Sequence, residues 1–362
     1  ILKNEKGVYD RVAIYKTKKD AEPIVVLEDG VFTQDIVDDV IYHDQKCTCT
    51  RNMRLLEVRP DGTGIKIWAS GAMEIGDDTF WHPKSLYQSV VDNVGYPKPI
   101  PILGGANKQL IEDCMIGEWN SICDWNADAL NYLIEREDYD IVFSQVHNVD
   151  GQAHMLVKFL KDHGDSLLPE ETYAEYMYRV YEQTDKYVEK FLYLLDKGWT
   201  IVLVSDHGLV ASEYEPLLMA DGFGVTGGVM EELGLTVFKK DENGNSIHEI
   251  DWEKTIAVNN RGNHIYVNLK GRDAHGIVEP KDKYEVEEEI MTRLYGYKHP
   301  VTGKRLAGLA IRNKDAVLLG LGGPKSGDII YFNTEGYNFD HADALSTTQG
   351  PGDTSVAPVF IA

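Results

Sequence analysis

Two largely apolar runs, residues 141–146 and 199–204, stand out in the pattern of hydrophobic and polar positions along the chain. β-Branched and apolar stretches of this length are typical of strands that are buried on both faces of a parallel sheet. Between them, apolar residues recur at helical spacing over 170–197, and Gly198 supplies a C-terminal stop. The succession of strand, helix and strand predicts an α/β fold.

The same alternation continues to the end of the chain. Asn126 is a suitable N-cap for a helix over 127–137, and a second amphipathic helix is predicted over 284–294. The other predicted elements are a short helix over 213–220 and strands over 265–269, 316–319, 328–332 and 358–362. Residues 105–362 are therefore expected to form one α/β core, with a mostly parallel sheet and helices on both faces.

The first hundred residues have a different pattern. Short apolar runs over 24–27, 55–58 and 65–68 predict strands, and Pro60-Asp61-Gly62 predicts a hairpin turn between the last two. Strands that pair with their neighbours along the chain form antiparallel sheets. Residues 1–104 are therefore expected to form a β-rich cap or insertion on the α/β core.

The charge balance narrows the class of ligand. The 362 residues include 59 acidic and 36 basic side chains, for a formal net charge of −23. A protein that tracks a nucleic-acid backbone needs a basic surface, so a nucleic-acid polymer is excluded as a partner. A metal site that binds one phosphate is compatible with this charge, because bound cations dominate the field of such a site. No run of about 18 apolar residues is present, so no membrane span is expected.

The cysteines and the chain ends bear on compartment and completeness. Four cysteines are too few for a disulfide scaffold in a chain of this length, and Cys47-Thr48-Cys49 lacks the second pair of a zinc ribbon. Ordinary thiols favour a reducing, cytoplasmic compartment. The chain begins at Ile1 instead of Met and ends on an apolar run, so we expect natural sequence beyond both ends.

Candidate chemistry follows each of the two apolar runs. Asp150 and His154 follow the first run, and their spacing places both on one face if a helix begins there. Asp206 and His207 follow the second run, before Gly208, which allows the backbone to turn. A single pair of this kind is a hydrogen-bonded loop corner as often as it is a metal site. Two such pairs, each after an apolar run, are hard to explain by packing alone. Because carboxylate and imidazole groups bind divalent metals and α/β sheets bind ligands at strand ends, two divalent cations are expected here.

These motifs resemble those of the alkaline phosphatase superfamily, in particular its type I phosphodiesterase/nucleotide pyrophosphatase branch. The shared features are an Asp-x-x-x-His motif at Asp150, a Ser-Asp-His-Gly motif at Ser205 and an Asn-Leu-x-Gly-Arg…Gly-Ile-Val pattern at Asn268. The resemblance covers residues 105–362 and implies an alkaline phosphatase-like fold.

The resemblance also implies a set of metal ligands. The residues that would bind the two zinc ions are Asp150 and His154 in one site, and Asp206 and His207 in the other. A distant C-terminal histidine completes the first site in the family. We favour His341 because it lies upstream of the terminal apolar run, although Ala342 follows it where the family has glycine. His264 and His275 are the alternatives.

The implied function is hydrolysis of a phosphodiester or pyrophosphate bond in a small phosphorylated substrate such as a nucleotide. The family attacks with a Thr or Ser hydroxyl in an early segment that follows an Asp-bearing strand, and residues 1–60 contain neither. We therefore expect a partial sequence that is inactive alone. The alternatives are a phosphatase, sulfatase or phosphonate hydrolase on the same fold, or a non-catalytic metal-binding protein, which the missing nucleophile favours.

Overall fold

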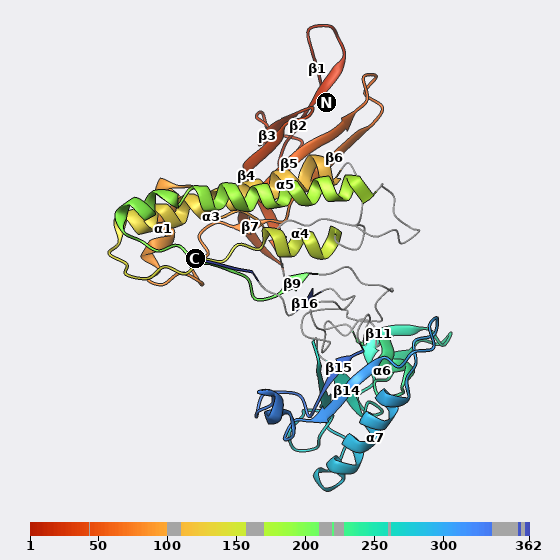
Figure 1. Cartoon of the computed structure of the whole chain (residues 1–362). Coiled ribbons are helices and arrows are strands. Elements are labelled where there is room, and N and C mark those ends of the chain that lie inside the picture. Colours follow the sequence, from red (N-terminus) through yellow and green to blue (C-terminus); the bar gives the residue numbers. More distant parts are fainter. Residues whose placement is uncertain are drawn as a thin grey trace. The chain divides into compact units, whose positions relative to one another are not determined.

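The computed structural model describes residues 1–42, 44–99, 110–156, 170–209, 219–220, 228–259, 262–334, 354–355 and 359–362. The chain divides into two compact units, unit 1 (Ile1–Ile201) and unit 2 (Val202–Ala362), and each is described by itself. Figure 1 labels their helices and strands. Among the described helices, none combines the length and the apolar character needed to cross a lipid bilayer.

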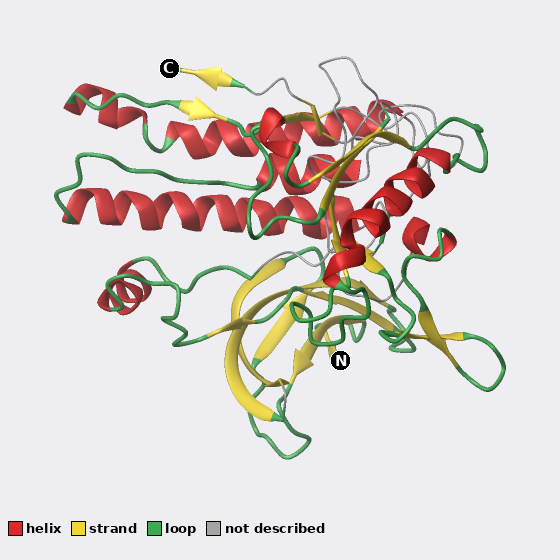
Figure 2. Cartoon of the chain, turned by 90° about the horizontal axis from the view of Figure 1, so that it is seen from below, coloured by secondary structure: helices red, strands yellow, loops and turns green. Residues whose placement is uncertain are grey.

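Antiparallel strands make up the first part of unit 1. They are β1 (Leu2–Lys3), β2 (Tyr9–Ile14), β3 (Val25–Glu28), β4 (Phe32–Tyr42), β5 (Gln45–Val58), β6 (Ile65–Ala69) and β7 (Met73–Glu74). β1, β2 and β3 form one sheet, and β4, β5 and β6 form another, in which β7 also pairs with β5. The hairpin predicted around Gly62 is confirmed by the pairing of β5 with β6. The long strands are strongly curved, as Figure 2 shows in yellow.

β4 contains a bulge where its pairing with β5 is irregular. The register with β5 shifts between Thr33 and Ile36, and Asp35 inside the bulge has a φ of +56°. Aspartate tolerates this left-handed conformation better than most residues. The Asp35 N–H donates to Asn52 Oδ1 at 3.2 Å, and Lys98 Nζ donates to both Asp35 carboxylate oxygens at 2.7 Å. These polar contacts on both sides of the residue stabilise the bulge.

Helices make up the rest of unit 1. They are α1 (Ser85–Asn93), the π-helical turn η1 (Ile111–Met115), α3 (Ile116–Arg136), α4 (Asn148–Leu156), α5 (Glu170–Glu189) and the 3₁₀ helix η3 (Leu192–Lys197). The helix predicted over 127–137 is the second half of α3, and the pattern over 170–197 covers α5 and η3. It ends as predicted at Gly198, which has a φ of +85°. α5 packs against both α3 and α4 (Figure 1).

Residues 141–146 form no strand, so the prediction of a doubly buried parallel strand is wrong for this segment. The segment is extended and pairs with no strand among the described residues. Ile141 and Phe143 are 86% and 85% exposed. On the other face, the Ser144 hydroxyl lies 2.5 Å from that of Tyr187, and Val146 joins the apolar core of α3 and α5. Helices thus cover one face only, and a parallel strand needs both covered.

Unit 2 is built around an antiparallel sheet with strand order β12-β13-β15-β14. Its elements are β8 (Leu203–Val204), β9 (Gly208–Leu209), α6 (Gly228–Glu232), β10 (Phe238–Lys240), β11 (Ser246–Ile250), β12 (Ala257–Asn259), β13 (His264–Val267), η4 (Pro280–Asp282), α7 (Lys283–Gly296), β14 (Ala307–Arg312), η5 (Ala316–Leu319), β15 (Ile329–Asn333), β16 (Thr354–Ser355) and β17 (Phe360–Ile361). The predictions for 265–269, 284–294 and 328–332 correspond to β13, α7 and β15. Fully buried Ile265 and Ile290 place the core of unit 2 between the sheet and α7.

Other predictions in the second half are corrected. Residues 316–319 form the 3₁₀ helix η5, with Val317 and Leu318 62% and 87% exposed, instead of a strand. The run 199–204 contributes only β8, and β8 pairs antiparallel with β17. Since every pairing of named strands in the described chain is antiparallel, it contains no mostly parallel sheet. The coarser expectation of a fold that mixes helices and sheets is confirmed. Most of the helix predicted over 213–220 lies outside the described residues.

The Asn-Leu-x-Gly-Arg…Gly-Ile-Val segment forms a turn held against the sheet of unit 2. Asn268 Nδ2 donates to three backbone carbonyl groups that surround it. Arg272 donates to both carboxylate oxygens of Asp328, at 2.7 and 2.9 Å. A Cβ atom on Gly276 would lie 2.2 Å from the Leu269 carbonyl oxygen, so only glycine fits there. These residues of the pattern therefore have structural roles.

Candidate metal centre

Asp150 lies in the first turn of α4, directly after the extended segment 141–146. The chain thus turns into a helix where the spacing of Asp150 and His154 requires one, and both positions share a helix face. Asp150 is partly buried, and the side chain of His154 lies outside the described part of the structure. The helical spacing is confirmed, whereas the role of both residues as metal ligands stays a prediction.

Buried neutral side chains hold α4 against α5 and α3. Asn148, the first residue of α4, is fully buried, and its Nδ2 donates to a carbonyl and a hydroxyl oxygen of α5 at 3.1 and 3.0 Å. Gln152 Nε2 donates to the Asn148 carbonyl and to Gln183 Oε1, both at 2.8 Å. Gln183 Nε2 in turn donates to the Ile116 carbonyl of α3 at 3.1 Å. We call Asn148, Gln152 and Gln183 the amide anchor of α4.

Gly151 lies between the two predicted ligands of α4 and touches α3. A Cβ atom at this position would lie 2.9 Å from Cζ2 of Trp119. Cβ atoms in proteins essentially never approach a neighbour so closely, so a larger residue requires α4 or Trp119 to move. The distance between α4 and α3 is therefore one that glycine permits.

Asp206 and His207 converge at the corner that follows β8. The His207 N–H donates to Asp206 Oδ1 at 3.1 Å, which turns the carboxylate back toward the imidazole ring. The same Oδ1 atom lies 3.8 Å from His207 Nε2. The Asp206 side chain is 81% exposed and that of His207 is 17% exposed. A carboxylate oxygen and an imidazole nitrogen thus lie close together at the surface of unit 2.

The donor atoms of this corner fit a divalent cation. His207 Nδ1 lies 2.9 Å from the Gly208 carbonyl, and an N–H at Nδ1 that donates there leaves the lone pair on Nε2. A tetrahedral zinc ion about 2.1 Å from two ligands places them about 3.4 Å apart, close to the observed 3.8 Å. Among the described side chains, no group of three or more His, Cys, Asp or Glu residues is arranged to bind a metal. The corner therefore offers part of a ligand set.

Residues from the end of the chain flank this corner on both sides. The Ser205 N–H donates to the Val359 carbonyl at 3.0 Å, and the Val359 N–H donates to Ser205 Oγ at 2.8 Å. After the corner, β9 pairs with β16. The serine of the Ser-Asp-His-Gly motif therefore binds backbone, and the C-terminal residues fix the course of the chain through the motif.

The third predicted histidine ligand, His341, lies outside the described residues, so its assignment stays a prediction. The two alternatives have structural surroundings. His264 Nδ1 accepts a hydrogen bond from the Gly327 N–H at 3.4 Å. The ring of His275 stacks on Trp252, with centroids 6.1 Å apart and an interplanar angle of 26°. Neither alternative belongs to a metal-binding group within the described chain.

A buried carboxyl group in unit 1 was missed from the sequence. Glu118 of α3 is fully buried, and its Oε2 accepts a hydrogen bond from Asn52 Nδ2 at 2.8 Å. Burial raises the pKa of Glu118 to about 7, although the Asn52 hydrogen bond and the positive charge of Lys98 act in the opposite direction. Glu118 lies three positions after Met115 and three before Ser121, both buried. Helical periodicity extended back to residue 115 would have placed it on the inward face.

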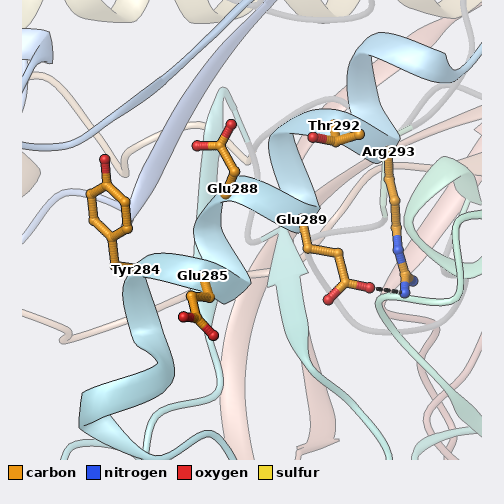
Figure 3. A pocket seen from close by; sticks show the side chains of 6 residues that line it. All are labelled: Tyr284, Glu285, Glu288, Glu289, Thr292 and Arg293. Carbon is orange, nitrogen blue, oxygen red and sulfur yellow. Dashed lines mark hydrogen bonds and ion pairs between the residues drawn. The ribbon is translucent and has the colours of Figure 1, made fainter.

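Two hollows of unit 2 involve α7, and neither includes a residue of the two motifs. The first, of about 600 Å³, is open to solvent along the outer face of α7, where Glu285, Glu288 and Glu289 project and Arg293 binds Glu289 (Figure 3). The second, of about 440 Å³, is lined by basic side chains, of which Arg272, Lys283 and Arg312 are paired with the buried carboxylates of Asp328 and Glu287. The acidic lining of the first hollow does not suit a phosphate group.

Comparison with known proteins places the motifs within one sequence family. The model of the family described as type I phosphodiesterase / nucleotide pyrophosphatase matches residues 92–355, which include every predicted metal ligand. No curated protein and no solved structure matches the chain at a significant level. The family match thus covers most of the chain.

Proposed function

The chain belongs to the type I phosphodiesterase/nucleotide pyrophosphatase family, and on this premise we propose that it hydrolyses phosphodiester or pyrophosphate bonds with the help of two divalent cations. The expected metal is zinc. The observation that carries the proposal is the approach of Asp206 Oδ1 to His207 Nε2, at 3.8 Å, inside the matched region. Family membership also implies an alkaline phosphatase-like fold for residues 92–355.

Each predicted ligand has a role in this proposal. Asp206 and His207 bind one cation, and the other is bound by three residues, which are Asp150, His154 and His341. When bound, the cations would stabilise negative charge on the phosphoryl oxygens and lower the pKa of the attacking hydroxyl group. The exposure of Asp206 leaves its carboxylate accessible from solvent, and the Gly208 carbonyl orients the imidazole ring of His207. We assign no nucleophile.

The proposed substrate is a small phosphorylated molecule, with a nucleotide as the first candidate. The family description names nucleotide pyrophosphatases, and the net charge of −23 disfavours a polyanionic nucleic acid. We further propose that residues 1–104 form a cap that selects the substrate, and that 105–362 contain the hydrolase core. Loops that select a ligand vary more than the scaffold beneath them, so substrate choice is expected to lie in this cap.

A metal-dependent assay of the protein expressed from its complete reading frame tests this function. We expect zinc-dependent hydrolysis of bis-p-nitrophenyl phosphate that a chelator removes and added zinc restores. Asp206→Asn should lower the rate at least about 100-fold, because even residues that only orient metal ligands cost 10- to 100-fold when changed. Asp196→Asn, at an exposed position of η3, is the matched control and should keep full activity. Full activity in Asp206→Asn would refute the ligand assignment.

A non-catalytic metal-binding protein is the second candidate. The lack of the family's nucleophile segment in residues 1–60 favours it. Stoichiometric zinc binding without hydrolysis of any phosphate ester would support this candidate over the first. The related phosphatase, sulfatase and phosphonate hydrolase activities are distinguished from phosphodiesterase activity by the relative hydrolysis rates of p-nitrophenyl phosphate, p-nitrophenyl sulfate and a phosphonate monoester.

A further inference from the structure

The position of α4 depends on its neighbours. Most of the stability of a helix in a protein comes from packing of one of its faces, and α4 packs against α5. Contacts with α3 and α5 therefore decide where α4 lies. Because Asp150 and His154 both belong to α4, the same contacts decide where the backbone of these two residues lies.

The amide anchor limits how α4 can move. Asn148 and Gln152 bind α5 by side-chain hydrogen bonds of 2.8 to 3.1 Å, and Gln183 continues the connection to α3. Sliding or rotating α4 would break these bonds between fully or nearly fully buried groups, which is costly in a dry interior. An atom added between α4 and α3 must therefore tilt α4 or displace the group that it meets.

That meeting point is the contact of Gly151 with Trp119. Gly151 stands between the predicted ligands, and a Cβ atom there would come within 2.9 Å of Trp119 Cζ2 and 3.4 Å of Cη2. Both atoms belong to the six-membered part of the indole, which a phenylalanine ring would not fill. The contact is therefore one that a smaller ring would relieve.

We propose that Trp119, through its contact with Gly151, is a positioning residue that sets the distance of α4 from α3 and thereby places Asp150 and His154 for binding a divalent cation. This inference rests on the proposed function, and it concerns residues of unit 1 alone. Trp119 touches neither metal nor substrate in this role. It acts through the helix that carries the ligands.

Cobalt(II) titration of the complete protein in the Asp206→Asn background, followed by absorption, isolates the site of Asp150. Gly151→Ala should weaken cobalt(II) binding about 10-fold, in the range for residues that orient metal ligands. Alanine is the better helix former, but a steric clash in a packed interior usually costs more than this preference gains, so the unfolding temperature should stay equal or fall. A structural role alone would lower the unfolding temperature and leave the affinity of the folded protein for cobalt(II) unchanged.

Rescue provides the decisive comparison. Trp119→Phe alone removes the contact and should also weaken cobalt(II) binding, by at least about threefold, whereas Gly151→Ala combined with Trp119→Phe should bind cobalt(II) more tightly than Gly151→Ala alone. Unchanged binding in Gly151→Ala, or no recovery in the double variant, overturns the inference. Asp150→Asn in the same background distinguishes a failure of the proposed ligand assignment from a failure of the inference about Trp119. If it binds cobalt(II) normally, the proposed ligand assignment fails and this inference with it, whereas loss of binding there leaves Gly151→Ala as the test of Trp119.

Discussion

The two predicted pairs of metal ligands differ in how the protein holds them. Asp150 projects from a helix that unit 1 fixes through the amide anchor and the Gly151–Trp119 contact. Asp206 projects from a corner of unit 2 between β8 and β9, and its side chain is 81% exposed. The first pair is held by packing around a helix, whereas the described contacts of the second corner are hydrogen bonds with the backbone of β16 and Val359.

The two units also differ in the chemistry of their buried polar groups. Both units bury amide groups, but the buried carboxyl group among the described residues of unit 1 is that of Glu118, whose pKa burial raises to about 7. Unit 2 buries carboxylates that are paired, such as Asp328 with Arg272. A low-dielectric interior tolerates a charge only with a partner. The stability of unit 1 is therefore expected to depend on pH near neutrality, and the stability of unit 2 on the presence of both partners of its buried ion pairs.

Removing the buried charge of unit 2 should have the largest effect on stability. Asp328 is 7% exposed, and although burial alone would raise its pKa, hydrogen bonds from Arg272, Val267 and Lys283 lower it. Asp328→Asn leaves two cations without their shared carboxylate. We expect a loss of about 3 kcal/mol in the free energy of unfolding, at the low end for a buried pair because Arg272 is 40% exposed. Denaturant unfolding measures it, with exposed Asp315→Asn as the control.

Neutralising the buried carboxyl of unit 1 should act in the opposite direction. The pKa of Glu118 is about 7 when folded against an ordinary 4.5, so the folded state keeps a proton that the unfolded state has lost between these values. Stability should therefore fall as pH rises from about 4.5 to 7 and then level off. Glu118→Gln keeps the Asn52 hydrogen bond but buries its own N–H groups, so we expect a gain of about 2 kcal/mol at pH 8. Unfolding curves at pH 5 and pH 8 give the difference; an equal effect at both would contradict the buried ionisation.

Disturbing the corner of unit 2 should reduce metal binding without loosening unit 1. Val359→Pro removes the N–H that Ser205 Oγ accepts at 2.8 Å. We expect zinc affinity at the Asp206 site to weaken about 10-fold, the scale for residues that orient ligands. Val359→Ala keeps the N–H and should bind zinc as the unchanged protein does. A similar loss in both variants would show that the side chain, and not the backbone hydrogen bond, matters.

The smallest effect is expected at His275, an alternative to His341 as the third ligand. Its ring stacks on Trp252 at the surface of unit 2, so His275→Ala should lower stability by only about 0.5 kcal/mol. Zinc content, measured by atomic emission after dialysis, should not change. Loss of one zinc equivalent in this variant would move the ligand assignment from His341 to His275.

The sequence predicted individual helices, turns and hairpins better than it predicted which segments pack against or pair with each other. The hairpin of β5 and β6, the helix α7 and the left-handed stop at Gly198 follow from turn residues and helical periodicity. The runs 141–146 and 316–319 are both mostly apolar, yet one face of the first is open, and the second coils into a 3₁₀ helix with Leu318 87% exposed. Apolar character does not reveal whether a second layer covers a segment, because that depends on residues distant in sequence.

For the candidate site, spacing was informative and packing was not. The helical spacing of Asp150 and His154 could be predicted because i and i+4 lie on one helix face. The approach of Asp206 to His207 depends on a backbone turn that Gly208 allows but does not require. Nothing in the sequence indicated that Gly151 meets Trp119, since the contact joins two helices about thirty residues apart.

The turn that contains Asn268, Arg272 and Gly276 has a consequence for tracing the ancestry of this protein. Its side chains satisfy carbonyl groups, neutralise Asp328 and avoid the Leu269 carbonyl, and none of these duties involves turnover. A descendant that lost catalysis would still need all three residues to fold. The turn therefore indicates common ancestry but not catalytic activity. A protein that keeps the turn and lacks Asp206 should be classed as a homologue without the proposed enzymatic activity.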